Sequence, residues 1–272
     1  MVDPEDADSS AAVLCTDLVR VYTAEGVEVQ ALQGLSLRVD PGELVAIVGH
    51  RLVGMSRTER VSYQRKAVGF IWQQTARNLL PYLTGAENIA IVLAVAGHPR
   101  RRARIDELLD LTDAADEANK LPAEMSGGQQ QRVAIAVALA NSPQVLLADE
   151  PTGELDEAAT QVVLETMRSV NEQIGTTTLI VTHDASVSGH VRRTIQIRDG
   201  RIAAETLRRT VIDYSGEQRQ VAEDFAVLDR VGRMQLPPEM VRTLDLRERV
   251  RLDQRADHVT VWPRSADEEY DR

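Results

Sequence analysis

The stretch QVLLADEPTGELD (Gln144–Asp156) is an apolar run that ends abruptly in two adjacent carboxylates, Asp149 and Glu150. Short continuous apolar runs are typical of buried parallel strands, whose carboxyl ends border the crevice where ligands bind. One carboxylate there can hold Mg²⁺ through water, and the next can orient an attacking water. The alternative is that a charged pair merely ends a strand.

Two further apolar runs, at residues 44–49 and 177–183, also predict buried parallel strands. From residue 13 to about residue 207, such runs alternate with longer helical patterns, which predicts an α/β domain. His183 ends the second run and is expected at the same edge of the sheet as the carboxylates. Gln73 follows another short apolar strand, although a lone histidine or glutamine is usually structural.

The segment MSGGQQQRVAIAVALA (residues 125–140) places Ser126 directly before a helical pattern. Gly127 and Gly128 would let a ligand approach the backbone, where unpaired N–H groups and the helix dipole favour an anion. A plain helix N-cap explains Ser126 but not the two glycines and the three glutamines after them.

Composition narrows the function classes. The chain has 272 residues, 43% of them hydrophobic, and a single cysteine, Cys15, which fits a reducing compartment. No apolar run approaches the roughly 18 residues that span a bilayer, and no basic segment of a signal peptide begins the chain. We therefore expect a cytosolic protein that reaches the membrane only through a partner. A net charge of −11 disfavours a nucleic-acid binder.

Taken in order, these residues resemble the ATP-binding subunit of ABC transporters. GFIWQ is similar to the family's Q-loop, MSGGQQQR to its signature motif, LLADEP to Walker B, GELD to the D-loop and VTHD to the H-loop. The resemblance covers residues 13–207, and NLLPYLTGAENI (78–89) favours the lipoprotein-release and macrolide-export branch. It implies a P-loop NTPase-like α/β domain with a helical subdomain, and a head-to-tail dimer that sandwiches two ATP molecules.

The resemblance also implies roles for single residues. Catalysis would rest on Glu150, which polarises the attacking water, and on His183, which contacts the γ-phosphate. Asp149 would hold Mg²⁺ through water, and Gln73 would sense both Mg²⁺ and the membrane partner. The remaining nucleotide contacts would come from Tyr22, which stacks on adenine, from the signature residues Ser126, Gly127, Gly128 and Gln129, and from Asp156 at the dimer interface.

In LVAIVGHRLVGMS (residues 44–56), Gly49, Gly54 and Ser56 fit the frame of the family's phosphate-binding loop, but Met55 stands in the lysine's position, so the loop is either substituted or absent. The residues that follow are polar and lack the apolar stripe of the expected helix. Only 24 positions separate Gly49 from Gln73, too few for a P-loop, its helix and a β-segment. We interpret this as a deletion after Gly49 and expect weak ATP binding. Lys66 and Lys120, the two lysines of the chain, lie too far along to replace the lost lysine.

The C-terminal part has its own pattern. We expect a disordered tail at residues 1–12, a linker at 208–222, a compact unit at 223–263 and an acidic tail at 264–272. The pattern D-R-x-G-R-x-x-L-P-x-E resembles the swapped-hairpin AbrB family, whose members dimerise and often bind DNA. The only mildly basic balance of residues 225–264 favours a dimerisation or regulatory role over nucleic-acid contact.

The leading hypothesis is an ATP-hydrolysing subunit that is peripheral on the inner membrane face and powers export through a separate permease. It would form a homo- or heterodimer with another such ATPase. One alternative is an inactive partner that completes the ATP site of another protomer. Another is a DNA-associated regulator that uses residues 223–263. A natural deletion, an engineered one and an error in the gene sequence all explain the missing loop.

Overall fold

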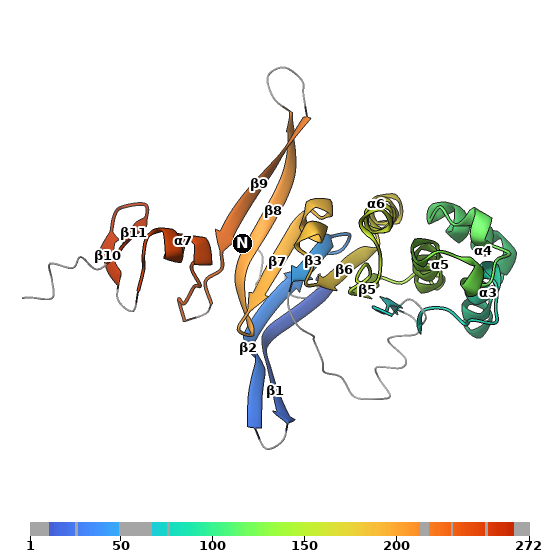
Figure 1. The fold of residues 1–272 in the computed structure, drawn as a ribbon, viewed down its shortest axis with the longest axis horizontal. Coiled ribbons are helices and arrows are strands. Elements are labelled where there is room, and N and C mark those ends of the chain that lie inside the picture. Colours follow the sequence, from blue (N-terminus) through green and yellow to red (C-terminus); the bar gives the residue numbers. More distant parts are fainter. Residues whose placement is uncertain are drawn as a thin grey trace, which may run out of the picture.

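The fold is known from a computed structural model, which describes residues 11–24, 27–48, 67–74, 77–212, 218–229, 231–247 and 250–263. A central sheet lies between a helical subdomain at one end of the molecule and a small C-terminal unit at the other (Figure 1). Within the described residues, no helix has the length and apolarity needed to cross a membrane.

In this part of the chain, seven strands form the central sheet. The first five in spatial order run parallel to one another. The sixth runs antiparallel to the fifth, and the seventh runs antiparallel to the sixth. Short β-branched runs such as the TTLIVT of β6 suit strands that are buried on both sides. The spatial order is β4 (Val68–Ile71), β5 (Val145–Asp149), β6 (Thr177–Thr182), β3 (Leu44–Val48), β7 (Arg193–Arg198), β8 (Arg201–Ile212) and β9 (Gln218–Ala226).

The helices begin at residues suited to cap them. Thr84 and Ser126 each form a capping box with the third helical residue, and the carboxylate of Asp156 accepts a hydrogen bond from Ala159 N. The helices are α3 (Gly85–Val95), α4 (Arg101–Leu111), α5 (Gly127–Leu139) and α6 (Glu157–Ile174), with 3₁₀ turns η2 (Ala115–Glu117), η3 (Pro122–Glu124) and η4 (Ala185–His190).

One face of the sheet, here the helical face, is closed. The cross-strand row Ile71, Ala148, Ile180 and Ala46 is at most 1% exposed, in one core with α3, α4, α5 and α6. Gly69 on β4 lets α5 approach the strand directly, because a Cβ at this position would lie 2.5 Å from the carbonyl oxygen of Ala138. The helix backbone therefore rests on the strand.

The opposite face, here the half-covered face, is closed over only part of its width. The hairpin of β1 (Val13–Ala24) and β2 (Val27–Val39) buries it over β3, with Val45 fully buried. Over β4 and β5, the aligned side chains of Phe70 and Leu147 are only partly buried. The sheet is therefore well packed on one side and thinly covered on the other.

The prediction of a linker at residues 208–222 is wrong wherever the structure describes residues of that range. Residues 208–212 belong to β8 and residues 218–222 to β9, paired in register with Arg208 opposite Ala222. Residues 223–226, expected to begin the C-terminal unit, also lie in β9, where Phe225 pairs with Glu205. Mixed arginine and threonine residues concealed these strands, because an antiparallel hairpin at a sheet edge needs little apolar surface.

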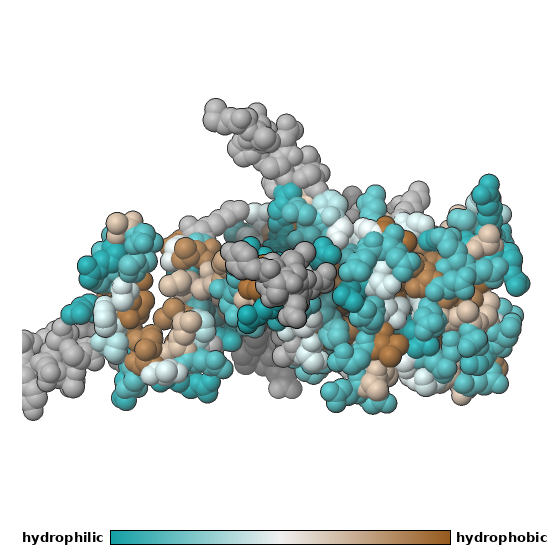
Figure 2. Space-filling model, turned by 90° about the horizontal axis from the view of Figure 1, so that it is seen from above, coloured by the Kyte–Doolittle hydropathy of each residue, from teal (hydrophilic) through white to brown (hydrophobic). Residues whose placement is uncertain are grey.

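The C-terminal unit is small. It holds the short helix α7 (Pro238–Thr243) and a hairpin of β10 (Val250–Gln254) and β11 (Val259–Pro263). Figure 2 shows apolar residues gathered on the surface of this end of the molecule. The expected tails, at residues 1–12 and 264–272, lie outside the described residues except for positions 11 and 12.

Candidate functional site

The carboxyl ends of β5 and β6 bring together the residues that the sequence singled out. The two strands are parallel neighbours with Asp149 opposite Val181, so Glu150 and His183 follow at one edge of the sheet. The backbone of Glu150 has a positive φ of 50° and donates from its N–H to Val181 O at 2.7 Å. This left-handed conformation is uncommon for a glutamate and is held by the neighbouring strand.

Three hydrogen bonds fix the Glu150 carboxylate. Oε2 accepts from Thr182 Oγ1 at 2.8 Å, and Oε1 accepts from His183 N at 2.9 Å. Nδ1 of the His183 ring lies 2.7 Å from the same Oε1. The Glu150 side chain is 16% exposed and that of His183 is 74% exposed, so the ring reaches outward from a carboxylate that stays in place.

The hydrogen bond and charge of Glu150 raise the pKa of His183 above its usual value. A carboxylate beside imidazole favours the protonated ring, because it accepts the hydrogen bond and compensates the charge. The next residue, Asp184, has a lowered pKa, because the Ser186 hydroxyl and backbone N–H donate to its carboxylate. At this edge of the sheet, the Glu150 carboxylate is therefore held in place beneath the exposed imidazole ring of His183, which binds a proton readily.

Gln73 reaches the same edge from β4. Residue 71 pairs with Ala148, so the chain leaves β4 beside the carboxylates. A Cβ on Gly153 would lie 3.7 Å from Gln73 Nε2 and 3.6 Å from Glu150 Cβ. The Gln73 amide thus lies near the turn that follows Glu150.

Ser126 and Gln129 are connected by the N-terminal cap of α5. The Ser126 hydroxyl accepts from Gln129 N at 3.3 Å, and Gln129 Oε1 accepts from Ser126 N at 2.8 Å. Gln129 Nε2 donates to the buried carboxylate of Glu117 at 2.6 Å. The plain capping role considered for Ser126 is therefore present, and both polar ends of Gln129 already have partners inside the protein.

Gly127, Gly128 and Asp156 lie where α5 and α6 begin side by side. A Cβ on Gly127 would be 3.0 Å from Leu155, and one on Gly128 would be 3.1 Å from the Cβ of Ala159. These glycines therefore have a packing role, since α6 starts immediately beside them. Asp156 caps α6 through Oδ1 and Ala159 N, at 2.8 Å.

Some expected site residues cannot be placed. The backbone of Tyr22 lies in β1 opposite Val29, but its side chain, the segment 49–56 and Lys66 lie outside the described part of the chain. Lys120 is described, and its Nζ lies 3.4 Å from Glu117 Oε1 in the helical subdomain.

Sequence reasoning missed two residues of this edge. Thr182 is fully buried, and its hydroxyl donates to Glu150 and accepts from Asp184 N at 3.0 Å. Gly153 lies in the turn beside Gln73, where an added Cβ would be at ordinary contact distance from the Gln73 amide. The hydroxyl that directly follows the apolar run Leu179–Val181 was the available signal for Thr182. No local pattern indicated the contact of Gly153.

A magnesium ion at this edge of the sheet would need ligands in addition to the side chains of the described residues. No group of three His, Cys, Asp or Glu side chains among the described residues could hold a metal ion. Asp149, half-buried at the end of β5, offers carboxylate oxygens of the kind that Mg²⁺ prefers. Mg²⁺ commonly keeps several waters and takes substrate phosphates as further ligands, so one carboxylate suffices.

Comparisons with known proteins agree with this arrangement. The family model described as ABC transporter matches residues 51–153. The methionine import ATP-binding protein MetN of Thermobifida fusca is 39% identical over 219 residues, which cover 70% of this chain and 68% of MetN. This chain belongs to the ABC transporter ATP-binding family. The macrolide export ATP-binding/permease protein MacB of Sodalis glossinidius is 40% identical over 217 residues, 69% of this chain.

Solved structures of ABC transporter cassettes have the same fold as this chain. The dimeric bacterial ABC transporter cassette MJ0796 has a TM-score of 0.60 and 30% identity, over 71% of this chain and 97% of that one. The same cassette is known in a post-hydrolysis state bound to ADP and Pi. The match covers only 33% of the Sodalis MacB, so this ABC chain corresponds to about a third of that ATP-binding/permease protein.

Proposed function

We propose that this chain is an ATPase subunit that couples ATP hydrolysis to export through a separate permease, on the inner face of the membrane. The observation that carries this proposal is the carboxylate of Glu150, held by Thr182 and His183 at the carboxyl edge of the sheet. A fixed carboxylate beside an imidazole is the arrangement that can orient a water and contact a transferred phosphoryl group.

In this proposal the chain binds ATP with Mg²⁺, and each residue of the edge has one task. Asp149 holds the metal ion through water, Glu150 polarises the attacking water and His183 contacts the γ-phosphate. Gln73 senses the metal ion and the permease. The contact of Gln73 with the turn after Glu150 supports this, because a displacement of either reaches the other.

The tasks proposed for the signature segment involve a second protomer. Ser126, Gly127, Gly128 and Gln129 cap the nucleotide of the opposite protomer, Asp156 crosses the interface, and Tyr22 stacks on adenine. The adjacent starts of α5 and α6 support an anion site, since both helices present free N–H groups and positive dipole ends. Dimeric cassettes among the structural relatives support a homo- or heterodimer.

We also propose that the phosphate loop and its helix are deleted after Gly49. The thin cover over Phe70 and Leu147 supports this. The crossover α6 leads from β5 to β6 over the helical face, and right-handed crossovers place a connection that runs back, from β3 to β4, on the other face. A helix in that connection would cover Phe70 and Leu147. The match to the family model, which begins at Arg51, agrees with a junction there.

The deletion favours a second function, that of a partner that completes the ATP site of a competent cassette. Its signature segment is described in full and capped, although the loop that would hold its own triphosphate is missing. A regulatory or dimerisation role of the C-terminal unit, from about residue 227 to 263, is compatible with both functions.

Isothermal titration of the purified chain with Mg²⁺–ATP tests these proposals. Each lost charge-assisted bond to phosphate is worth about 1.5–3 kcal/mol, so we expect binding weaker than millimolar. Mixing the chain with a loop-competent cassette that carries a mutated signature serine tests the partner function. Restored ATPase activity in the mixture supports it. Micromolar ATP binding by the chain alone contradicts the deletion.

A further inference from the structure

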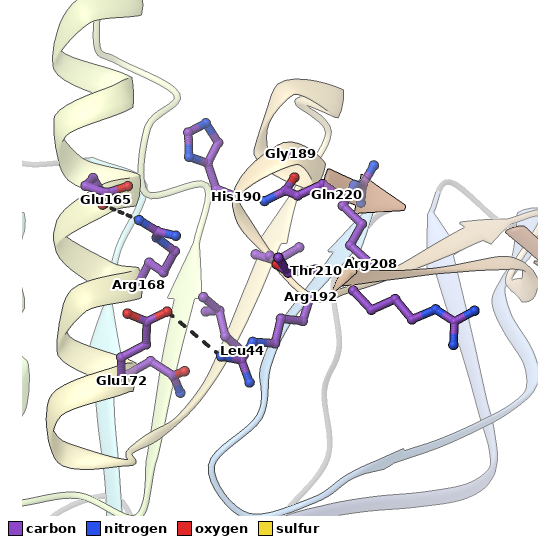
Figure 3. A pocket seen from close by; sticks show the side chains of 13 residues that line it. Leu44, Glu165, Arg168, Glu172, Gly189, His190, Arg192, Arg208, Thr210 and Gln220 are labelled. Carbon is purple, nitrogen blue, oxygen red and sulfur yellow. Dashed lines mark hydrogen bonds and ion pairs between the residues drawn. The ribbon is translucent and has the colours of Figure 1, made fainter. Parts of the chain in front are cut away.

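A groove of about 480 Å³ lies between α6, the end of η4 with the two residues that follow it, and the strands β8 and β9 (Figure 3). It borders Leu44, the first residue of β3, whereas Glu150 and His183 follow the last residues of β5 and β6. The groove is therefore at the amino edge of the parallel strands, at the opposite end from the candidate ATP site.

Four arginines line this groove against two glutamates, in a chain whose net charge is −11. Two of the arginines are already paired, Arg168 with Glu165 on α6 and Arg209 with Glu223 on β9. The other two are Arg192 and Arg208. A positive cavity on an acidic protein concentrates anions from solution, because the local potential decides where they bind.

Arg192 and Arg208 lie directly opposite each other across β7 and β8. Arg208 N donates to Arg192 O at 2.7 Å, and the adjacent residues Arg193 and Leu207 are register partners. Opposite residues of an antiparallel pair project from the same face, and like charges in that position are destabilising. A shared anion would remove this repulsion.

The existing partners of these two guanidinium groups are weak. Arg192 Nη2 lies 3.9 Å from Glu172 Oε1, and the Arg192 side chain is 83% exposed. Arg208 donates only to the hydroxyls of Ser188 and Thr194, at 3.3 and 3.4 Å, and has no acidic partner among the described residues. Both groups can therefore turn to a ligand without breaking a strong ion pair.

The remaining lining indicates the class of ligand. Thr210 and Gln220 are cross-strand partners and add a hydroxyl and an amide, while Leu44 and Val191 are the apolar residues of the lining. No phenylalanine, tyrosine or tryptophan is among the described residues that line the groove, and the imidazole of His190 adds a polar ring to its lining. The volume exceeds that of an inorganic phosphate. A small phosphate ester with a polar body fits this lining, since arginine binds phosphate with paired donors.

We propose that this groove is a binding site for a phosphate ester, held between Arg192 and Arg208 and distinct from the candidate ATP site. The same chemistry is offered by a free sugar or glycerol phosphate and by the headgroup of an acidic phospholipid. The two sources differ in whether the phosphate is dissolved or presented on a membrane.

Isothermal titration with glycerol 1-phosphate, and flotation with phosphatidylcholine vesicles with and without phosphatidylglycerol, test the site on the full chain. We expect saturable binding either of glycerol 1-phosphate or to the vesicles that contain phosphatidylglycerol. The Arg208→Gln variant should bind that probe with an affinity at least about tenfold lower. Arg209→Gln is the matched control, because its charge is already compensated by Glu223, and it should lower affinity less. Circular dichroism checks that each variant folds.

His183→Ala separates this site from the ATP site. The proposal is supported if a probe still binds to the His183→Ala variant and binds more weakly to the Arg208→Gln variant. This holds whether the probe is glycerol 1-phosphate or the vesicle with phosphatidylglycerol. The proposal is overturned if neither probe binds, if Arg208→Gln binds as well as the parent chain, or if His183→Ala abolishes the binding.

Discussion

The two faces of the central sheet differ although they share the same strands. On the helical face, Leu146 is fully buried beneath the helices, whereas its neighbour Leu147 on the other face is only partly buried. Since successive residues of a strand point to opposite faces, the difference reflects what covers each face, not the strand itself. The sheet therefore keeps its strand order and its candidate site although the described residues cover one of its faces only thinly.

Restoring the layer that the proposed deletion removes should have the largest effect. Insertion of the phosphate loop and following helix of a related cassette after Gly49 should tighten ATP binding by at least about a thousandfold, because several charge-assisted bonds are regained. It should also raise the melting temperature by covering Phe70 and Leu147. Titration calorimetry and thermal unfolding measure both effects. An insert whose loop lysine is alanine is the control and should restore stability more than affinity. Equal ATP affinity with and without the insert would contradict the deletion.

A pair of adjacent substitutions compares the faces directly. Leu146→Ala should cost about 2–5 kcal/mol of unfolding free energy, because it leaves a cavity in a closed core. Leu147→Ala should cost about 1 kcal/mol, since a half-buried side chain loses less on truncation. Urea unfolding of the two variants gives both values. Equal costs would mean that the half-covered face is as well packed as the other.

The cap of α5 gives a smaller effect on the helical face. Ser126→Ala should lower the unfolding free energy by about 1 kcal/mol, because Gln129 N loses its acceptor at the helix start. Ser126→Asp is the control and should retain most of the stability, since its carboxylate can also cap. Chemical denaturation measures both. An unchanged midpoint for the alanine variant would show that the cap is not formed in solution.

The pH response of His183 should be the smallest effect. The folded-state pKa is raised above about 6.5, so the contribution of the Glu150–His183 pair is present below pH 6.5 and lost as pH rises through the folded pKa. Glu150→Gln should lower the His183 pKa toward the ordinary value, which NMR titration of the ring can follow. The stability difference between the two proteins should shrink as the pH rises. A His183 pKa that is unchanged by this substitution would exclude the pair.

Much of the fold and of the catalytic edge was predictable from the sequence. The apolar runs ending at Asp149 and His183 predicted the strands, because burial on both sides leaves an unbroken hydrophobic pattern. The hairpin of β8 and β9 was not predictable in the same way, since its strands mix Arg208, Thr210 and similar residues at a solvent-facing edge. The contact of Gln73 with Gly153 was also hidden, because it depends on tertiary packing between distant segments.

Gly69 has a mechanical consequence for the ATP site. Since the α5 backbone touches β4 without an intervening side chain, no compressible layer separates the strand that carries Gln73 from the helix that starts at Ser126. In the proposed function, a displacement of the loop after β4 would therefore reach α5 directly, through backbone contact.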